Sequence, residues 1–151
     1  KIKNITNKIK DVCIGADVIV GFPGETKTEF NKTLDFIKNL PLSYLHVFSY
    51  SERENTEAVN LHGNVKKEER AERSKQLRIL SDKLQRAFYK KNINKNHVVL
   101  FEQKNKNGML FGFTNNYIKV KVNYNADICK TKQKIKLINM DVDGIMNAEI
   151  I

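Results

Sequence analysis

The stretch GADVIVGFPGET, residues 15–26, predicts a buried strand that runs into a helix through a tight turn. Residues 14–20 are nearly all apolar, and a short continuous apolar run is typical of a parallel strand that is covered on both faces. Gly21 and Gly24 permit positive φ angles and Pro23 fixes its own φ, so the backbone dominates the turn. The carboxyl end of such a strand is where parallel α/β folds bind ligands.

A helix is predicted immediately after this turn. Thr26 and Glu29 have the T-x-x-E spacing of a capping box, which satisfies backbone N–H groups at the start of a helix. Phe30, Leu34 and Ile37 then repeat at helical spacing. The stretch therefore predicts a βα unit with an open loop at the end of its strand.

Three interpretations of this loop can be compared. A phosphate-binding P-loop is excluded, because no Gly-Lys-Ser/Thr closes the turn and Glu25 stands where phosphates need a cation. Residues 21–24 fit the letters of the GXXG clamp of KH domains, but that clamp needs positive surroundings to hold a nucleic-acid backbone. A plain strand-to-helix turn and a ligand-binding turn both stay open on this segment alone.

The whole chain has the composition of a soluble globular protein. Its 151 residues, 40% hydrophobic and 29% charged, suffice for one ordinary domain or two small ones. No apolar run reaches membrane-spanning length, and the lysine-rich start lacks the apolar core of a signal peptide, so we expect a cytoplasmic protein. Cys13 and Cys129 have no CxxC or Cys/His partner, so neither a zinc site nor a disulfide framework is indicated.

A second strand is predicted over residues 44–49, where both alternating faces carry bulky side chains. His46 is interpreted as a half-buried histidine, since no second catalytic group stands at a fixed spacing from it. Ser51 and Arg53 follow the strand, and they face the same crevice as the loop of residues 21–25 if the two strands are parallel. Arg53 could pair there with a carboxylate or a phosphate, or be solvated.

A long basic helix is predicted after a polar, irregular segment that looks like a domain boundary. Asn64 can cap this helix, which is expected to run from Val65 to about Lys91. Residues 66–91 hold ten Lys or Arg against four Asp or Glu. The first half, residues 66–73, is polar all round, which usually means a solvated face. The second half has an apolar stripe of Leu77, Leu80, Leu84, Ala87 and Phe88.

Beyond residue 92 the hydrophobic period changes from that of a helix to that of strands. Five short strands separated by turns favour a small barrel of the OB-like class. Asn115 and Asn116 fit a tight hairpin turn between two of them. The predicted strands are residues 97–102, 109–113, 117–122, 134–139 and 145–150.

Lysines alternate with apolar residues in this second half. Tyr117, Lys119 and Lys121 share one face, opposite Ile118, Val120 and Val122, and Lys132, Lys134 and Lys136 repeat the pattern against Ile135 and Leu137. Exposed lysines keep strands soluble, yet a formal charge of +10 also indicates a nucleic-acid partner. The lysines would contact phosphates, and Phe113 or Tyr117 could stack on an unpaired base. A membrane partner would need an amphipathic helix with an aromatic apolar face or a lipidation motif, and neither is evident.

The first half of the chain resembles the radical S-adenosylmethionine enzymes. Residues 15–26 are similar to a late strand of their barrel, and VFSYSER, residues 47–53, resembles the next strand in the methylthiotransferase family. His46 and residues 56–58 look most like the branch that methylthiolates threonylcarbamoyladenosine beside the tRNA anticodon. Asn55 stands where this family usually has glycine.

The second half resembles the TRAM domain, an RNA-binding β-barrel that closes these methylthiotransferases. The resemblance is carried by VVLFE, residues 98–102, and by GFTNNYIKV, residues 112–120. Together the two resemblances imply an α/β plus all-β architecture. It consists of the last part of a partial radical S-adenosylmethionine barrel (residues 1–64), a connecting basic helix (65–91) and a TRAM-like OB-type barrel (92–151).

The resemblance also implies site residues. The adenine of S-adenosylmethionine would lie against the strand that includes Val18 and Ile19 and against the backbone of the next strand, with Gly21 leaving room for it. The second strand contributes Val47, Phe48 and Ser49. The tRNA anticodon stem-loop would be bound by Arg53, Phe113, Tyr117, Lys119, Lys121, Lys134 and Lys136.

The family uses S-adenosylmethionine and two 4Fe-4S clusters, one of them held by a CxxxCxxC triplet. This chain has no such triplet. We therefore interpret it as the C-terminal part of a longer, monomeric enzyme, and we predict that alone it binds tRNA but performs no chemistry. Two alternatives stay open. One is a sister methylthiotransferase for isopentenyladenosine or a ribosomal protein, and the other is a non-enzymatic RNA-binding module.

Overall fold

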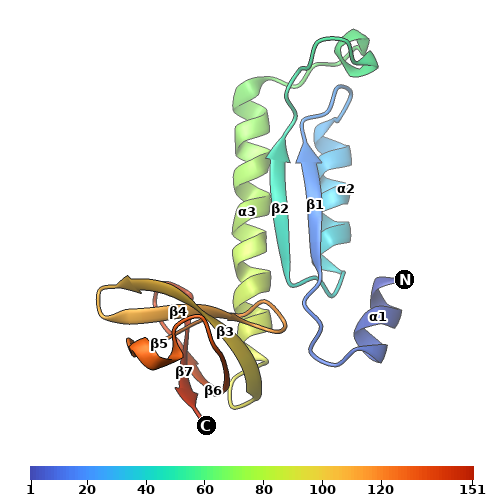
Figure 1. Cartoon of the computed structure of the whole chain (residues 1–151). Coiled ribbons are helices and arrows are strands. Elements are labelled where there is room, and N and C mark those ends of the chain that lie inside the picture. Colours follow the sequence, from blue (N-terminus) through green and yellow to red (C-terminus); the bar gives the residue numbers. More distant parts are fainter. The chain divides into compact units, whose positions relative to one another are not determined.

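The two strands predicted in the first half pair in parallel. In the computed structural model, β1 is Gly15–Val20 and β2 is Tyr44–Ser49, with Ile19 directly beside Phe48. The structure describes the backbone of residues 1–151 and the side chains of residues 1–102 and 107–151. The parallel pairing confirms that the loops after β1 and β2 leave the same edge of the sheet (Figure 1).

The helix after β1 begins where its capping signal predicts. It is α2, Lys27–Lys38, and the side chain of its N-cap Thr26 accepts a hydrogen bond from the backbone N–H of Glu29. The carboxylate of Glu29 accepts a hydrogen bond from the Thr26 hydroxyl, which lowers the pKa of Glu29. A short helix, α1 (Ile2–Lys8), precedes β1, and a 3₁₀ turn, η1 (Glu57–Asn60), follows β2.

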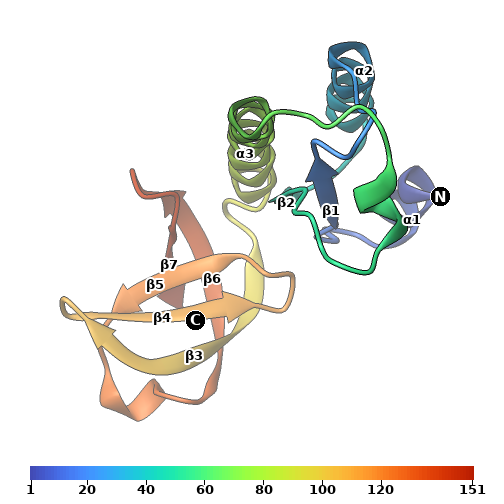
Figure 2. The same ribbon diagram turned by 90° about the horizontal axis from the view of Figure 1, so that it is seen from above.

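The sheet is covered on one face, so the prediction that both faces are buried is wrong. The long helix α3, Lys67–Lys90, and α2 lie on the same side of β1 and β2 (Figures 1 and 2). Phe30 of α2 and Leu77 of α3 are buried there with Val20 of β1. Side chains alternate across a strand, so the opposite face leaves Ile19 59% and Phe48 53% exposed.

The helix α3 differs from its prediction at its start. It begins at Lys67 rather than Val65. The expectation of a solvated face over residues 66–73 is also wrong, because Arg70 and Arg73 are buried. Contacts divide the chain into two compact units within this helix: unit 1 holds Lys1–Lys10 and Ile14–Gln85, and unit 2 holds Asp11–Cys13 and Arg86–Ile151. The predicted domain bounds at residues 64 and 91 stay a prediction.

Unit 2 contains the predicted five-stranded barrel, which closes in the order β3-β4-β5-β7-β6 (Figure 2). Its strands and one 3₁₀ turn are β3 (Asn96–Lys106), β4 (Met109–Thr114), β5 (Lys119–Asn123), η2 (Ala126–Ile128), β6 (Lys132–Met140) and β7 (Met146–Ile150). The neighbouring pairs are antiparallel except β5 with β7, which is parallel. This confirms a small OB-like barrel.

The barrel core is filled by alternate residues of every strand, as the sequence pattern predicts. Val99, Leu110, Val120, Ile135 and Met146, one from each strand, are fully buried. The ring of Tyr89, near the end of α3, joins this core, and its hydroxyl accepts a hydrogen bond from the backbone N–H of Lys119 at 3.0 Å. Among the described residues, none of the helices combines the length and the apolar character that a membrane crossing requires.

Candidate functional site

An open groove lies beside the carboxyl ends of β1 and β2. Its volume is about 480 Å³. The lining residues come from both strands and from the segments that follow them: Ile19, Phe22, Phe48, Ser49, Tyr50, Ser51, Arg53, Thr56 and Ala58. The parallel pairing brings these segments together, as predicted for Ser51, Arg53 and the loop after β1.

The groove has an apolar floor and a polar rim. Ile19 and Phe48 belong to the uncovered sheet face, and Phe22 is 45% exposed beside them. The rings of Phe22 and Tyr50 meet edge to face, with centroids 5.3 Å apart. The hydroxyl of Tyr50 is buried and has no hydrogen-bond partner among the described residues. A flat apolar surface next to hydroxyl and guanidinium groups suits a ligand with an aromatic ring and a polar tail.

The predicted cofactor residues divide between the two faces of the sheet. Ile19, Phe48 and Ser49 line the groove. Val18 and Val47 instead pack their side chains into the core under the helices, so only their backbone is left for a ligand. Gly21 has a φ of +77°, and a Cβ built there would lie 2.3 Å from Cγ of Arg70.

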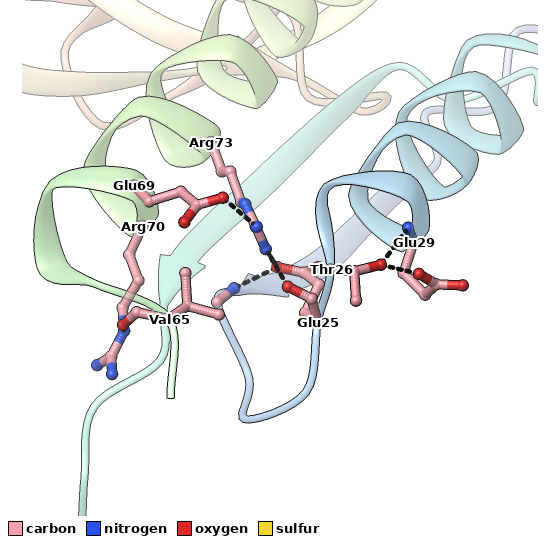
Figure 3. Close-up of polar contacts among 8 residues, drawn as sticks. Glu25, Thr26, Glu29, Val65, Glu69, Arg70 and Arg73 are labelled. Carbon is pink, nitrogen blue, oxygen red and sulfur yellow. Dashed lines mark hydrogen bonds and ion pairs between the residues drawn. The ribbon is translucent and has the colours of Figure 1, made fainter. Parts of the chain in front are cut away.

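Arg73 holds the loop between β1 and α2 in place (Figure 3). Its guanidinium donates to the backbone oxygen of Glu25 at 2.8 Å and to the Glu25 carboxylate at 2.5 Å, and it also pairs with Glu69 at 2.5 Å. The Glu25 carboxylate in turn accepts the backbone N–H of Gly21 at 2.6 Å. Burial opposes the charge of Arg73, but the hydrogen bonds to Glu25 and Glu69 outweigh it and raise its pKa.

Arg70 binds the segment after β2 in a similar way. Its guanidinium donates to the backbone oxygens of Val65 at 2.8 Å and Tyr50 at 3.0 Å, and to the Glu52 carboxylate at 2.6 Å. It also lies over the ring of Tyr50, 5.2 Å from the centroid. The hydrogen bond from Arg70 lowers the pKa of Glu52 to about 2.

Neither arginine was predicted to be a functional residue, although the helical period of the sequence contains a signal for both. The apolar stripe of α3 includes Leu77, Leu80 and Leu84. Continued backwards in steps of seven residues, the same stripe reaches Arg73 from Leu80 and Arg70 from Leu77. Arginines that extend an apolar stripe predict buried, paired guanidinium groups rather than a solvated face.

A second candidate surface lies on the outside of the barrel. The strand registers place Leu100 beside both Lys132 and Phe113, and Phe113 beside Lys119, so that one row crosses four strands. Leu100 is 52% and Phe113 41% exposed, and both lysines are exposed. This row, which we call the lysine–apolar row, has a cation at each end and two apolar side chains between them, of which the aromatic Phe113 can stack on a base.

The other predicted RNA-binding residues lie at different places around the barrel. Lys134 pairs in register with the exposed Val98, and Lys136 is exposed farther along β6. Tyr117 is 71% exposed but precedes β5, in a turn with a φ of +63°, so its predicted place inside the strand is wrong. Lys121 forms an ion pair with Asp141 and lowers the pKa of that carboxyl group.

No metal centre is found among the described residues, because their His, Cys, Asp and Glu side chains form no group of three or more that could hold an ion. His46, predicted to be half-buried, is exposed, and its ring meets that of Tyr44 edge to face at 5.0 Å. Arg53 lines the groove rather than the barrel. The groove and the lysine–apolar row are therefore the two candidate sites.

Comparison with known proteins finds methylthiotransferases among the relatives of the chain. The chain is 32% identical over 142 residues to the threonylcarbamoyladenosine tRNA methylthiotransferase MtaB of Bacillus subtilis, which covers 91% of the chain and 32% of that protein. It is 35% identical over 158 residues to the tRNA-2-methylthio-N(6)-dimethylallyladenosine synthase of Buchnera aphidicola, covering 100% of the chain and 36% of that protein.

A third relative acts on a protein rather than on tRNA. It is the ribosomal protein uS12 methylthiotransferase RimO of Clostridioides difficile, 32% identical over 114 residues, with 76% of the chain and 26% of that protein covered. No family model matches the chain. The chain thus spans about a third of the length of the curated relatives that it matches.

Proposed function

This chain is homologous to a segment of the methylthiotransferases, and we propose that it is the C-terminal region of a tRNA methylthiotransferase that acts on threonylcarbamoyladenosine beside the anticodon. The extent of the matches to the relatives carries the assignment to the methylthiotransferases. The choice of threonylcarbamoyladenosine rests on the resemblance of His46 and residues 56–58 to that branch. A match over 142 residues includes both the sheet of unit 1 and the barrel of unit 2. The parent enzyme is proposed to be cytoplasmic and monomeric.

The groove is proposed to hold the adenosyl end of S-adenosylmethionine. The apolar side chains of Ile19 and Phe48 suit the flat face of an adenine, and Phe22 closes the groove next to them. Ser49 and Arg53 on its rim can hydrogen-bond hydroxyl and carboxylate groups. When bound, this cofactor supplies the methyl group and the radical chemistry of the reaction.

The two 4Fe-4S clusters of the family do not fit this chain. Cys13 and Cys129 are its cysteines, and they do not make up the three cysteine ligands of a CxxxCxxC site. We assign both clusters to a further part of the parent protein. This chain then contributes one wall of the cofactor site and a surface for RNA, and it performs no chemistry alone.

The lysine–apolar row is proposed to bind the tRNA anticodon stem-loop. Lys119 and Lys132 would contact phosphates, while Phe113 and Leu100 would pack against an unpaired base. Lys134 and Lys136 extend the positive surface along β6. Support for this role comes from the charge of +10 and from the apolar side chains that lie exposed between lysines.

Two sister activities remain candidates because relatives of each kind match the chain. One is methylthiolation of dimethylallyladenosine in tRNA, and the other is methylthiolation of ribosomal protein uS12. These relatives are 35% and 32% identical, close to the 32% of the Bacillus subtilis relative. Sequence identity therefore does not separate the three substrates.

Nucleoside mass spectrometry of bulk tRNA from cells that lack the gene tests the proposal. We expect the methylthio group to disappear from threonylcarbamoyladenosine and to return when the gene is restored. Loss from isopentenyladenosine instead would assign the protein to the sister tRNA branch. An unchanged nucleoside profile would contradict a tRNA substrate, and mass spectrometry of uS12 from the same cells would then test the ribosomal branch.

A further inference from the structure

Two buried arginines of α3 contact the segments that carry groove-lining residues without lining the groove themselves. The side chains of Arg70 and Arg73 are 6% and 5% exposed. Burial of a guanidinium is unfavourable unless its donors are paired, and both side chains are paired with carboxylates and backbone oxygens. Such a network fixes the segments that supply the acceptors.

Arg73 fixes the groove wall that carries Phe22. The Glu25 carboxylate accepts hydrogen bonds from Arg73 and from the backbone N–H of Gly21. It therefore ties together the two ends of the turn that contains Phe22. The backbone N–H of Glu25 also donates to the oxygen of Phe22 at 2.9 Å. The position of the Phe22 ring therefore depends on the contact between Arg73 and Glu25.

Arg70 fixes the part of the groove that carries Tyr50. It binds the backbone oxygen of Tyr50 and lies over the Tyr50 ring, while Glu52, two residues farther along, pairs with the same guanidinium. The methylene groups of Arg70 pass over Gly21, where a Cβ would be 2.3 Å from Cγ. Arg70 thus contacts the ends of both strands that form the groove.

We propose that Arg70 and Arg73 are positioning residues of the groove, which hold Phe22 and Tyr50 in the arrangement that binds the adenosyl group. This inference rests on the proposed role of the groove as part of a cofactor site. It gives the first turns of α3, none of whose residues lines the groove, a role in cofactor affinity. A rigid shell behind contacting residues preserves their geometry, and its loss lowers affinity without removing a contact.

Calorimetric titration of the full-length protein with S-adenosylmethionine tests the proposal. Arg70→Met and Arg73→Met keep the apolar stem of each side chain, and Arg78→Met is the matched control because Arg78 is exposed on the same helix. We expect each of the first two variants to weaken binding about tenfold. The control should remain within about twofold of the wild type.

A second ligand separates positioning from general unfolding. Affinity for tRNA, measured on the same preparations, should stay within about twofold in all three variants, because the lysine–apolar row does not include α3. If Arg73→Met does not fold, Arg73→Lys takes its place, since it keeps the charge but cannot bind Glu25 and Glu69 with a planar fork. Weaker cofactor binding with unchanged tRNA binding is again the expected result.

Wild-type affinity for S-adenosylmethionine in both arginine variants would overturn the positioning role and leave the proposed function intact. Equal losses for the cofactor and for tRNA would also overturn it, since they indicate general destabilisation. A wild-type protein that does not bind S-adenosylmethionine at all would overturn the proposed function of the groove, and the positioning role with it.

Discussion

Gly21 is crossed by the side chain of Arg70, so a β-carbon at this position has no space. It also has a φ of +77°, in the left-handed region that favours glycine. Gly24, three residues on, has a φ of +86°, but a β-carbon there would meet no atom of the described residues within 4 Å. Gly21 is therefore required both by its backbone conformation and by the lack of space for a side chain, whereas Gly24 is required by its backbone conformation alone.

Replacing each glycine with alanine separates these constraints. Gly24→Ala should lower the free energy of unfolding by about 1–2 kcal/mol, the cost of a side chain in the left-handed region. Gly21→Ala should cost about 1–3 kcal/mol more, because Arg70 must also move. Urea unfolding followed by circular dichroism measures both, and equal losses would show that Arg70 does not fill the space over Gly21.

The ion pair between Glu52 and Arg70 predicts a pH dependence of stability. The pKa of Glu52 falls from 4.5 to about 2 in the folded protein. A lowered carboxyl pKa stabilises the fold above pH 4.5, and this stabilisation is lost as the pH falls towards 2. Glu52→Gln should therefore be less stable than the wild type at pH 6, and the difference should shrink at low pH.

Urea midpoints at pH 6 and near pH 2 measure that difference. Glu54→Gln, an exposed residue of the same segment, provides the control and should show no such convergence. A gap between wild type and Glu52→Gln that has the same size at both pH values would rule out the ion pair as its cause.

Tyr89 gives a residue-level test of the barrel. Burial raises the pKa of its phenol, and its hydroxyl accepts the backbone N–H of Lys119. Tyr89→Phe keeps the ring but leaves that N–H group without its partner, which should cost about 1–3 kcal/mol of unfolding free energy. Tyr117→Phe, at a 71% exposed position, should change it by less than about 0.5 kcal/mol. Equal urea midpoints for the two variants would contradict the contact.

At the scale of helices and strands, local signals predicted the elements well. The strands of unit 1, the cap of α2 and the inward and outward alternation of β5 and β6 all follow from spacing within a few residues. Burial was less predictable. Ile19 and Phe48 were expected to be covered, but which face a helix covers depends on contacts between distant segments.

Contacts between elements also decide which charges are free. Arg70 and Arg73 looked solvated, because two of their three carboxylate partners, Glu52 and Glu25, lie far away in the sequence. Lys121 alternates with apolar residues just as Lys119 does, yet Asp141 neutralises it from twenty residues away. Leu100 and Phe113 became neighbours only through the register of β3 and β4. Sequence spacing gives the face of a strand but not its partner across the barrel.

The ion pair of Lys121 leads to a prediction about which lysines on the outside of the barrel bind tRNA. Lys119→Gln combined with Lys132→Gln should flatten the slope of log K against log salt concentration for tRNA binding by about 1.5, since each phosphate contact contributes about 0.7–0.9. Lys121→Gln should leave the slope nearly unchanged, because Asp141 already pairs with that ammonium group. An unchanged slope in the double variant would show that the lysine–apolar row does not bind phosphates.

At the scale of the whole molecule, the chain carries a groove with an apolar floor in one unit and a positive, partly apolar surface in the other. The helix α3 contributes to the core of each unit, through Leu77 in the first and Tyr89 in the second. Relatives from three branches of the methylthiotransferases match the chain. If the groove serves the reaction, a charged substitution in its lining should lower the activity of the enzyme. A charged substitution at an equally exposed apolar residue elsewhere should not.

Two phenylalanines make this comparison direct. Phe48 lines the groove and is 53% exposed, while Phe36 of α2 is 66% exposed and is not part of the groove lining. An aspartate at either position stays accessible to water, so both variants should accumulate to similar levels, which immunoblotting checks. Only Phe48→Asp places a carboxylate against the proposed adenine surface.

The most direct measurement is the methylthio content of tRNA from cells whose single copy of the gene carries one of these substitutions. We predict that Phe48→Asp abolishes the methylthio group on threonylcarbamoyladenosine, while Phe36→Asp retains it at the wild-type level. Full modification in cells with Phe48→Asp would contradict the proposal that this groove binds the cofactor of a tRNA methylthiotransferase.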